Sequence, residues 1–151
     1  MSYPCVTLDS NVFTKVFLDE EHSVQARDCI RMLTRQKIPV ICPDIFLYEI
    51  LSIAAQNSFP ISEALRLLRS FENANLSLQP LNGLQLELAI KMAEEGHPKS
   101  GYPSIYDSSY HALAIAHQGL FITADGRNIA KAKQFGDVCH LSEISDYLDM
   151  Q

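Results

Sequence analysis

The sequence predicts an α/β fold, a three-layer α/β/α sandwich in which helices cover both faces of a central, mostly parallel sheet. Short apolar runs typical of buried strands alternate with longer segments of helical periodicity. The chain has 151 residues, of which 47% are hydrophobic. That length and composition allow one domain with a substantial core and fit two domains poorly. We therefore expect a single domain over 1–151.

Turn and capping residues set the expected element boundaries. Asp44 and Ser62 are placed to cap two helices, and Gly96 and Gly119 to end two others. In chain order, we expect a strand at 5–8, a helix at 21–36, a strand at 40–42, helices at 45–57 and 62–72, a strand at 76–81, helices at 84–95 and 104–117, a strand at 120–122, a helix at 126–135, a strand at 138–140 and a helix at 142–149.

Several protein classes are disfavoured by composition. No apolar run reaches the roughly 18 to 20 residues of a membrane-spanning helix, and the N-terminal MSYPCVTLDSN lacks the basic start of a signal peptide. The four cysteines form no C-x-x-C pair, so we expect buried free thiols, as in the reducing cytoplasm. The net charge of −6 argues against a large non-specific nucleic-acid surface, but a carboxylate site would itself contribute negative charge.

Four acidic residues are predicted to meet at one edge of the sheet. Asp9 directly follows the first strand, and Asp125 follows the run LFIT with one residue between. Glu49 lies on the helix after the second strand, and Asp107 lies in the first turn of the helix that begins near Ser104. Ligands of parallel α/β sheets bind beyond the carboxyl ends of the strands. The four positions therefore predict one acidic crevice.

Glu49 is the hardest of the four to explain as a surface charge. It stands in the apolar run FLYEILSIAA, with no Lys or Arg within one helical turn. Burying an isolated carboxylate costs several kcal/mol unless a partner compensates it. A cation supplied from elsewhere, such as a metal ion, would serve.

Each of the other acids also has an ordinary structural interpretation. Asp9 could cap a helix that starts at Ser10 or Asn11, Asp107 would complement a helix dipole, and Asp125 could be a turn residue. Taken singly, these interpretations are the stronger ones. The convergence of all four acids on one crevice favours a functional site.

Carboxylate oxygens are the ligands that Mg²⁺ and Mn²⁺ prefer. A carboxylate-held ion can activate a water as a nucleophile, and a second ion about 3.5 to 4 Å away can stabilise the leaving oxygen. The acidic cluster therefore predicts metal-dependent hydrolysis of phosphodiester bonds.

Three stretches of the chain resemble the sequence blocks of the PIN domain and, within it, of the VapC-type toxins of bacterial toxin–antitoxin pairs. LDSNVF at 8–13 looks like the first block, and PDIFLYEILSIA at 43–54 looks like the second. SIYDSSYHALAIAHQGLFITADGRN at 104–128 is similar to the third and fourth blocks together. The order and spacing match along most of the chain.

The resemblance implies a sheet of about five parallel strands and Mg²⁺- or Mn²⁺-dependent cleavage of RNA. Asp9, Glu49 and Asp107 match the three core acids of the family, and Asp125 matches its fourth, more variable acid. The resemblance also implies a homodimer and a small antitoxin protein that lies over the active-site groove.

Supporting residues follow from the same blocks. Ser10 matches the small polar residue after the first acid, and Thr123 matches the hydroxyl that could orient Asp125 or a water. His111 departs from the family, which more often has an apolar residue there. It is interpreted as a helix-face histidine hydrogen-bonded near the site or at an interface, or else as a partner that orients Asp107.

The predicted function is therefore that of a metal-dependent endoribonuclease and toxin. The alternative is a PIN-like module that binds RNA or protein with little or no cleavage. Arg127 and Lys131 are candidates for RNA phosphate contacts, although each is also explained as a solvated helix charge. A haloacid-dehalogenase phosphatase needs an acid where Asn11 stands, and a receiver domain needs paired acids near the first strand, so both are disfavoured.

Overall fold

Five parallel strands form one sheet in the computed structural model, which describes residues 3–151. In chain order the elements are β1 (Val6–Leu8), α1 (Ser10–Phe17), α2 (Ser23–Arg35), β2 (Val40–Pro43), α3 (Ile45–Gln56), α4 (Ile61–Ala74), β3 (Leu76–Gln79), α5 (Gly83–Glu95), α6 (Ile105–Ala116), β4 (Leu120–Thr123), α7 (Gly126–Ala132), the 3-10 turn η1 (Lys133–Phe135), β5 (Val138–His140) and the 3-10 turn η2 (Leu141–Asp146).

The strands lie in the order β3-β2-β1-β4-β5. The chain builds β1, β2 and β3 outward in one direction, then returns to place β4 on the other side of β1, where Val6 pairs with Leu120 and Leu8 with Ile122. The strand order therefore reverses between β1 and β4. In open parallel sheets, a crevice forms at this reversal, beyond the carboxyl ends of the strands.

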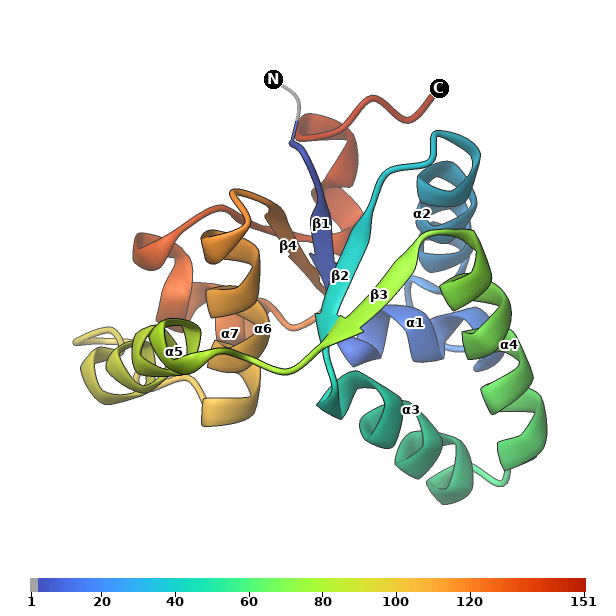
Figure 1. Ribbon diagram of the computed structural model, residues 1–151, viewed down its shortest axis with the longest axis horizontal. Coiled ribbons are helices and arrows are strands. Elements are labelled where there is room, and N and C mark those ends of the chain that lie inside the picture. The colour runs from blue at the N-terminus through green and yellow to red at the C-terminus, as the bar shows by residue number, and fades with distance from the viewer. Residues whose placement is uncertain (1–2) are drawn as a thin grey trace.

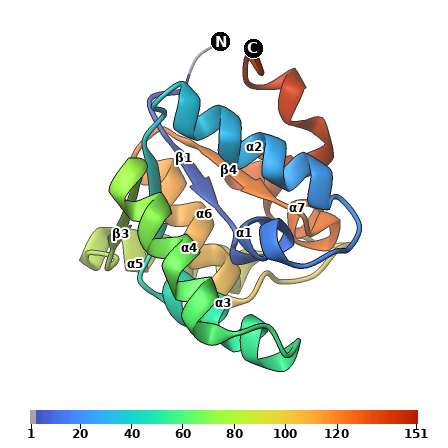
Figure 2. The same cartoon turned by 90° about the vertical axis from the view of Figure 1, so that its right-hand side faces the viewer.

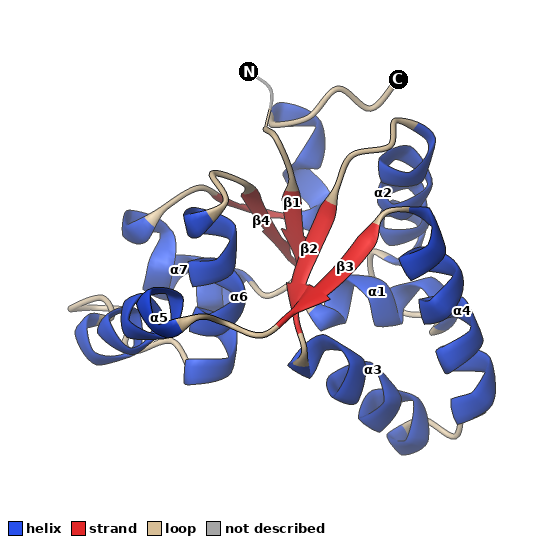
Figure 3. Ribbon diagram, in the orientation of Figure 1, coloured by secondary structure: helices blue, strands red, loops and turns tan. Residues whose placement is uncertain are grey.

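Helices cover both faces of the sheet, which confirms the predicted three-layer architecture. Helices α5, α6 and α7 lie on one side, and α1, α2 and α4 lie on the other (Figures 1 and 3). Figure 2 looks onto the second layer, where α1 packs against both α2 and α3. The side chains of β1 and β4 are buried along their whole length, as expected for central strands covered on both faces.

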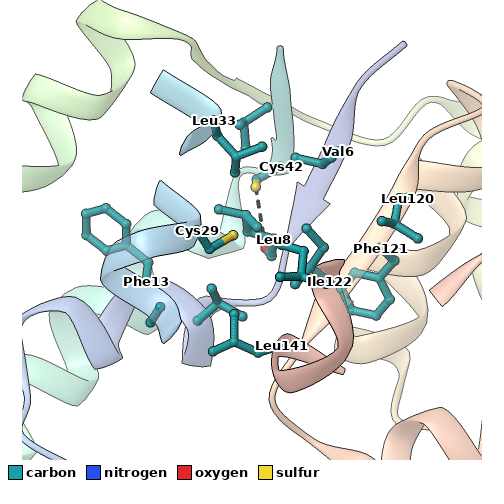
Figure 4. Close-up of a cluster of buried hydrophobic side chains, with 14 of the residues drawn as sticks. Val6, Leu8, Phe13, Cys29, Leu33, Cys42, Leu120, Phe121, Ile122 and Leu141 are labelled. Atoms are coloured by element: carbon teal, nitrogen blue, oxygen red, sulfur yellow. Dashed lines mark hydrogen bonds between the residues drawn. The ribbon is translucent and has the colours of Figure 1, made fainter. Parts of the chain in front are cut away.

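The main core fills the space between the sheet and the layer of α1 and α2, and it also includes Tyr110 and Ala114 of α6. Val6 and Leu8 of β1 face Cys29 and Leu33 of α2 there (Figure 4). All four cysteines are free and buried, as predicted. The Cys42 thiol donates a hydrogen bond to the Leu8 carbonyl at 3.4 Å. Burial raises the pKa of the Cys29 thiol to about 12, so this sulfur stays protonated and serves as an apolar core atom.

Several predicted boundaries and caps are wrong. Asp44 has helical backbone angles and makes no capping hydrogen bond, and α4 begins before Ser62, with Pro60 at the capping position. The helix expected at 142–149 is the short turn η2, in which Leu141 and Ile144 are both buried. Residues three apart share one face of a 3-10 turn, so this geometry buries both side chains in a short segment. The helix expected at 126–135 ends at Ala132 and continues as η1.

Among residues 3–151, every helix is too short or too polar to span a lipid bilayer.

The turn from α6 into β4 requires a glycine at position 119. A Cβ there would lie 2.8 Å from the Cys5 carbonyl oxygen and 2.7 Å from the Cys5 sulfur. We predict that Gly119→Ala lowers the free energy of unfolding by about 1–3 kcal/mol, because Cys5, directly before β1, must shift to make room. Urea denaturation measures this loss.

The matched control is Gly83→Ala at the start of α5, where a Cβ meets nothing within 4 Å. It should leave the free energy of unfolding unchanged or slightly higher. Equal effects of the two substitutions would contradict the steric explanation.

Candidate active site

Asp9 lies at the end of β1, at the point where the strand order reverses. Its backbone N–H donates to the Ile122 carbonyl at 2.9 Å, which extends the pairing of β1 with β4. The residue is 5% exposed. It occupies the N-terminal capping position of α1, but its side chain makes no capping hydrogen bond. The carboxylate is therefore directed to other partners.

Two side chains hold one oxygen of the Asp9 carboxylate. The Thr123 hydroxyl donates to Asp9 Oδ2 at 2.8 Å, and the Asn11 amide donates to the same atom at 3.3 Å. Thr123 Oγ1 also accepts from the Asp125 N–H at 3.0 Å, and Asn11 Oδ1 accepts from the Ala124 N–H at 3.1 Å. The ends of β1 and β4 are thus joined by a small network around Asp9.

Asp125 follows β4 and caps α7. Its Oδ1 accepts from the Arg127 N–H at 3.0 Å and from the Asn128 N–H at 3.4 Å. These bonds to the backbone give Asp125 the ordinary role of a turn residue that was considered for it. The side chain is half-buried, and its charge still acts on both Asp9 and Asp107.

Glu49 is half-buried on α3 and has a protein partner that the sequence did not reveal. The Tyr110 hydroxyl of α6 donates a hydrogen bond to Glu49 Oε1. The Tyr110 ring is buried, with Phe46 edge-on at 6.4 Å and Phe121 stacked at 6.1 Å between centroids. Burial and the adjacent carboxylate raise the pKa of Tyr110, so its hydroxyl remains a donor. This bond partly compensates the buried carboxylate.

Asp107 lies in the first turn of α6, and its N–H donates to the capping Ser104 hydroxyl at 3.0 Å. The side chain is half-buried. Burial raises its pKa, the charges of Asp125 and Glu49 add to this rise, and the charge of Lys131 opposes it.

The four acids are close enough to repel one another. Burial is the largest cause that raises the pKa of Asp9 to about 7, followed by the charge of Asp107. Glu49 and Asp125 contribute in the same direction, while the Thr123 hydrogen bond lowers the pKa. Such crowding disfavours the fully ionised state and would be relieved by a bound cation.

The donor set fits a hard divalent cation, although not as a closed cage. Within residues 3–151, no group of three or more His, Cys, Asp or Glu side chains is arranged to hold a metal ion. Mg²⁺ usually keeps several waters and uses only one or two carboxylates. Four neighbouring acids that form no closed cage therefore suit an ion bound partly by carboxylates directly and partly through water. Both hydrogen bonds that reach the Asp9 side chain in this part of the chain end on Oδ2, so Oδ1 remains for a ligand.

The remaining predicted residues divide into two groups. Ser10 is buried beside Asp9, and Lys131 of α7 is near enough to act on Asp107. His111 instead contacts the segment before β5: its Nε2 lies 3.2 Å from the Gly136 carbonyl, and burial lowers its pKa to about 4. Its hydrogen-bond partner is thus the Gly136 carbonyl and not Asp107, which only one of the two interpretations of His111 had named. Arg127 is exposed.

Asn11 and Tyr110 are the residues that sequence reasoning missed. Asn11 had a usable signal, because it lies two positions after Asp9 within the first block. Tyr110 had none, because its bond to Glu49 spans 61 positions and depends on how α3 packs against α6.

Comparison with known proteins places the chain in a family. The family model of the PIN domain matches residues 6–134. The comparison with curated proteins finds no matching sequence.

Solved structures give the same fold. VapBC2 from Rickettsia felis, bound to a DNA fragment from its promoter, is 14% identical, with 90% of this chain and 98% of that chain covered and a TM-score of 0.67. DNA-bound VapBC from Salmonella typhimurium is 16% identical, with 91% and 98% covered and a TM-score of 0.66. VapC20 from Mycobacterium tuberculosis, a Sarcin-Ricin loop cleaving toxin, is 13% identical, with 80% and 90% covered and a TM-score of 0.61.

At these identities the structural likeness establishes the fold, whereas the sequence match extends over most of the chain and includes all four acids of the crevice. The chain belongs to the PIN domain family.

Proposed function

We propose that the chain is a Mg²⁺- or Mn²⁺-dependent endoribonuclease and the toxin of a VapC-type toxin–antitoxin pair. The observation that carries this proposal is the buried Asp9 carboxylate, held at the strand reversal and crowded by three further acids. A purely structural cluster gains nothing from mutual repulsion. The Mycobacterium tuberculosis VapC20 toxin supports a cleaving activity for this fold.

Asp9 and Asp107 are the proposed principal ligands of the cation, with Glu49 and Asp125 as further ligands, directly or through water. When bound, the cation would supply a Lewis acid for the phosphodiester and make a water nucleophilic near neutral pH. Thr123 and Asn11 hold Oδ2 of Asp9, which fixes the direction of Oδ1. Tyr110 fixes Glu49 in the same way.

The proposal extends to partners and setting. One domain over 1–151 would act in the cytoplasm on RNA, as a homodimer restrained by a small antitoxin. The VapBC structures from Rickettsia felis and Salmonella typhimurium support a partner protein of this kind. Lys131, and more weakly Arg127, would contact RNA phosphates.

Cleavage is predicted to depend on Asp9. With Mn²⁺, the wild-type chain should cleave generic RNA and show a higher melting temperature than in EDTA. Asp9→Asn should reduce the cleavage rate by at least about a hundredfold, because a principal ligand loses its charge. Its circular dichroism spectrum should not change.

Glu94→Gln is the matched control, since it removes an exposed acid on α5, outside the cluster. It should retain both cleavage and the Mn²⁺ effect. If Mn²⁺ neither supports cleavage nor raises the melting temperature of the wild type, the chain is instead a PIN-like module that binds RNA or protein.

Without a bound cation, the protein is predicted to become less stable as the pH rises, because the carboxylates of the site are crowded. The pKa of Asp9 is raised to about 7 in the folded state. Its contribution to stability is therefore present below the unfolded pKa near 4 and is lost as pH rises through 7. In EDTA at pH 8, Asp9→Asn should raise the free energy of unfolding by about 2–4 kcal/mol.

That advantage should shrink as the pH is lowered toward 4, where the wild-type carboxyl is protonated. Urea titrations of both proteins across this range measure the difference. A variant that is less stable than the wild type at every pH would mark the Asp9 carboxylate as a structural group.

Tyr110→Phe is predicted to weaken the cation site while preserving the core. The substitution removes only the hydroxyl that orients Glu49. Loss of such a supporting bond typically costs about 10- to 100-fold in metal affinity or activity. Titration calorimetry with Mn²⁺ gives the affinity, and Tyr3→Phe, which removes the exposed bond to Asp137, is the control. Unchanged Mn²⁺ affinity in Tyr110→Phe would count against a ligand role for Glu49.

A further inference from the structure

Two tyrosine rings stand exposed beside the acidic crevice. Tyr48 of α3 is 67% exposed, and Tyr106 in the first turn of α6 is 59% exposed. Together with Ile45, Glu49 and Ser52 they line a cleft of about 300 Å³, called here the tyrosine cleft. Aromatic rings are large apolar surfaces, and a pair of them left open around one cleft indicates a surface that binds something.

We propose that the tyrosine cleft binds an unpaired nucleobase of the RNA, stacked against Tyr48, Tyr106 or both. This inference rests on the proposed ribonuclease function and deepens it, because it assigns single-stranded RNA as the substrate form and names residues that hold it.

Glu49 connects the cleft to the acidic crevice. One of its oxygens accepts the Tyr110 hydrogen bond from the interior, while the residue also lines the cleft on the outside. A nucleotide carries a phosphate and a flat ring on the same unit. A phosphate placed at the acids therefore has a neighbouring base within reach of the adjoining cleft. The Glu49 carboxylate could also accept a hydrogen bond from an amino group of that base.

The charge of the chain makes stacking the more effective source of affinity. Only 12 Lys and Arg oppose 18 Asp and Glu. Within residues 3–151, five of the basic side chains are already in ion pairs with nearby acids, namely Lys15, Arg31, Arg66, Arg69 and Lys91. Attraction to phosphates is accordingly weak. Stacking on aromatic rings needs no positive charge and tolerates any base.

Base pairing would block this interaction, because a paired base is stacked within its own helix and cannot enter the cleft. An unpaired base in a loop or a single strand can be turned out and held. The tyrosine cleft thus selects for unpaired RNA, independently of the chemistry at the acids.

The test compares three variants with the wild type. Tyr48→Ala with Tyr106→Ala removes both rings, and Tyr48→Phe with Tyr106→Phe keeps them. Tyr102→Ala is the matched control, since Tyr102 is 66% exposed and lies outside the cleft lining. The probe is a single-stranded oligoribonucleotide with 2-aminopurine in place of adenine and hydrolysis-resistant phosphorothioate linkages. It is bound with Mg²⁺, so that its phosphate can approach the acids without being cleaved. Its base-paired duplex is measured in parallel.

The wild type should quench the 2-aminopurine fluorescence of the single strand and not of the duplex. Loss of both rings should abolish quenching and raise Kd about five- to hundredfold, while the Phe pair and Tyr102→Ala should match the wild type. With Mn²⁺, the Ala pair should raise KM for single-stranded RNA with kcat kept within a few-fold. Between 50 and 200 mM salt, the wild-type Kd should rise by less than about tenfold.

The outcomes separate the two proposals. Wild-type quenching and KM in the Ala pair, or equal binding of the duplex, overturn the tyrosine cleft while leaving the ribonuclease proposal intact. Quenching by the wild type without any Mn²⁺-dependent cleavage overturns the ribonuclease and not the cleft. If the Ala pair binds RNA normally but no longer self-associates in sedimentation, the cleft is a protein interface and the proposal is wrong.

Discussion

The hydrogen bond from Thr123 to Asp9 ties together the ends of two neighbouring parallel strands, and the geometry of the crevice depends on it. β1 and β4 meet only because the chain returns to the other side of β1 after completing β3. The same Thr123 oxygen accepts the N–H of Asp125, so one hydroxyl places both strand-end acids. Without the pairing of β1 with β4, Asp9 and Asp125, which are far apart in the sequence, would not lie side by side.

Electrostatic strain at the crevice is balanced by packing behind it. The central strands β1 and β4 are buried on both faces, and the rings of Phe46 and Phe121 fix Tyr110 against Glu49. Rigid apolar neighbours hold the carboxylates in place although their charges repel. We expect such a site to lower stability when no cation is bound, and this cost would distinguish it from a set of ordinary capping residues.

For a chain with this acidic balance, the proposed action on RNA requires affinity from something other than a basic surface. The acids themselves would attract the substrate only through a shared cation, and Lys131 is a single positive charge that acts on Asp107. Exposed rings beside Glu49 offer a contact that does not depend on charge. We therefore propose that two parts of the surface share the binding of RNA. The acids bind the phosphate through a cation, and the tyrosine cleft binds the base.

The alternation of strands and helices, the parallel sheet and the edge at which the four acids stand were all determined by the sequence, because periodicity and turn residues act locally. Capping roles were less predictable: Asp44 makes no cap and Asp125 makes one. Only the tertiary structure decided which atoms meet. The bonds of Thr123 to Asp9 and of Tyr110 to Glu49 span 114 and 61 positions, and His111 turns to Gly136 instead of Asp107. Such partners depend on strand order and helix packing, which no local pattern records.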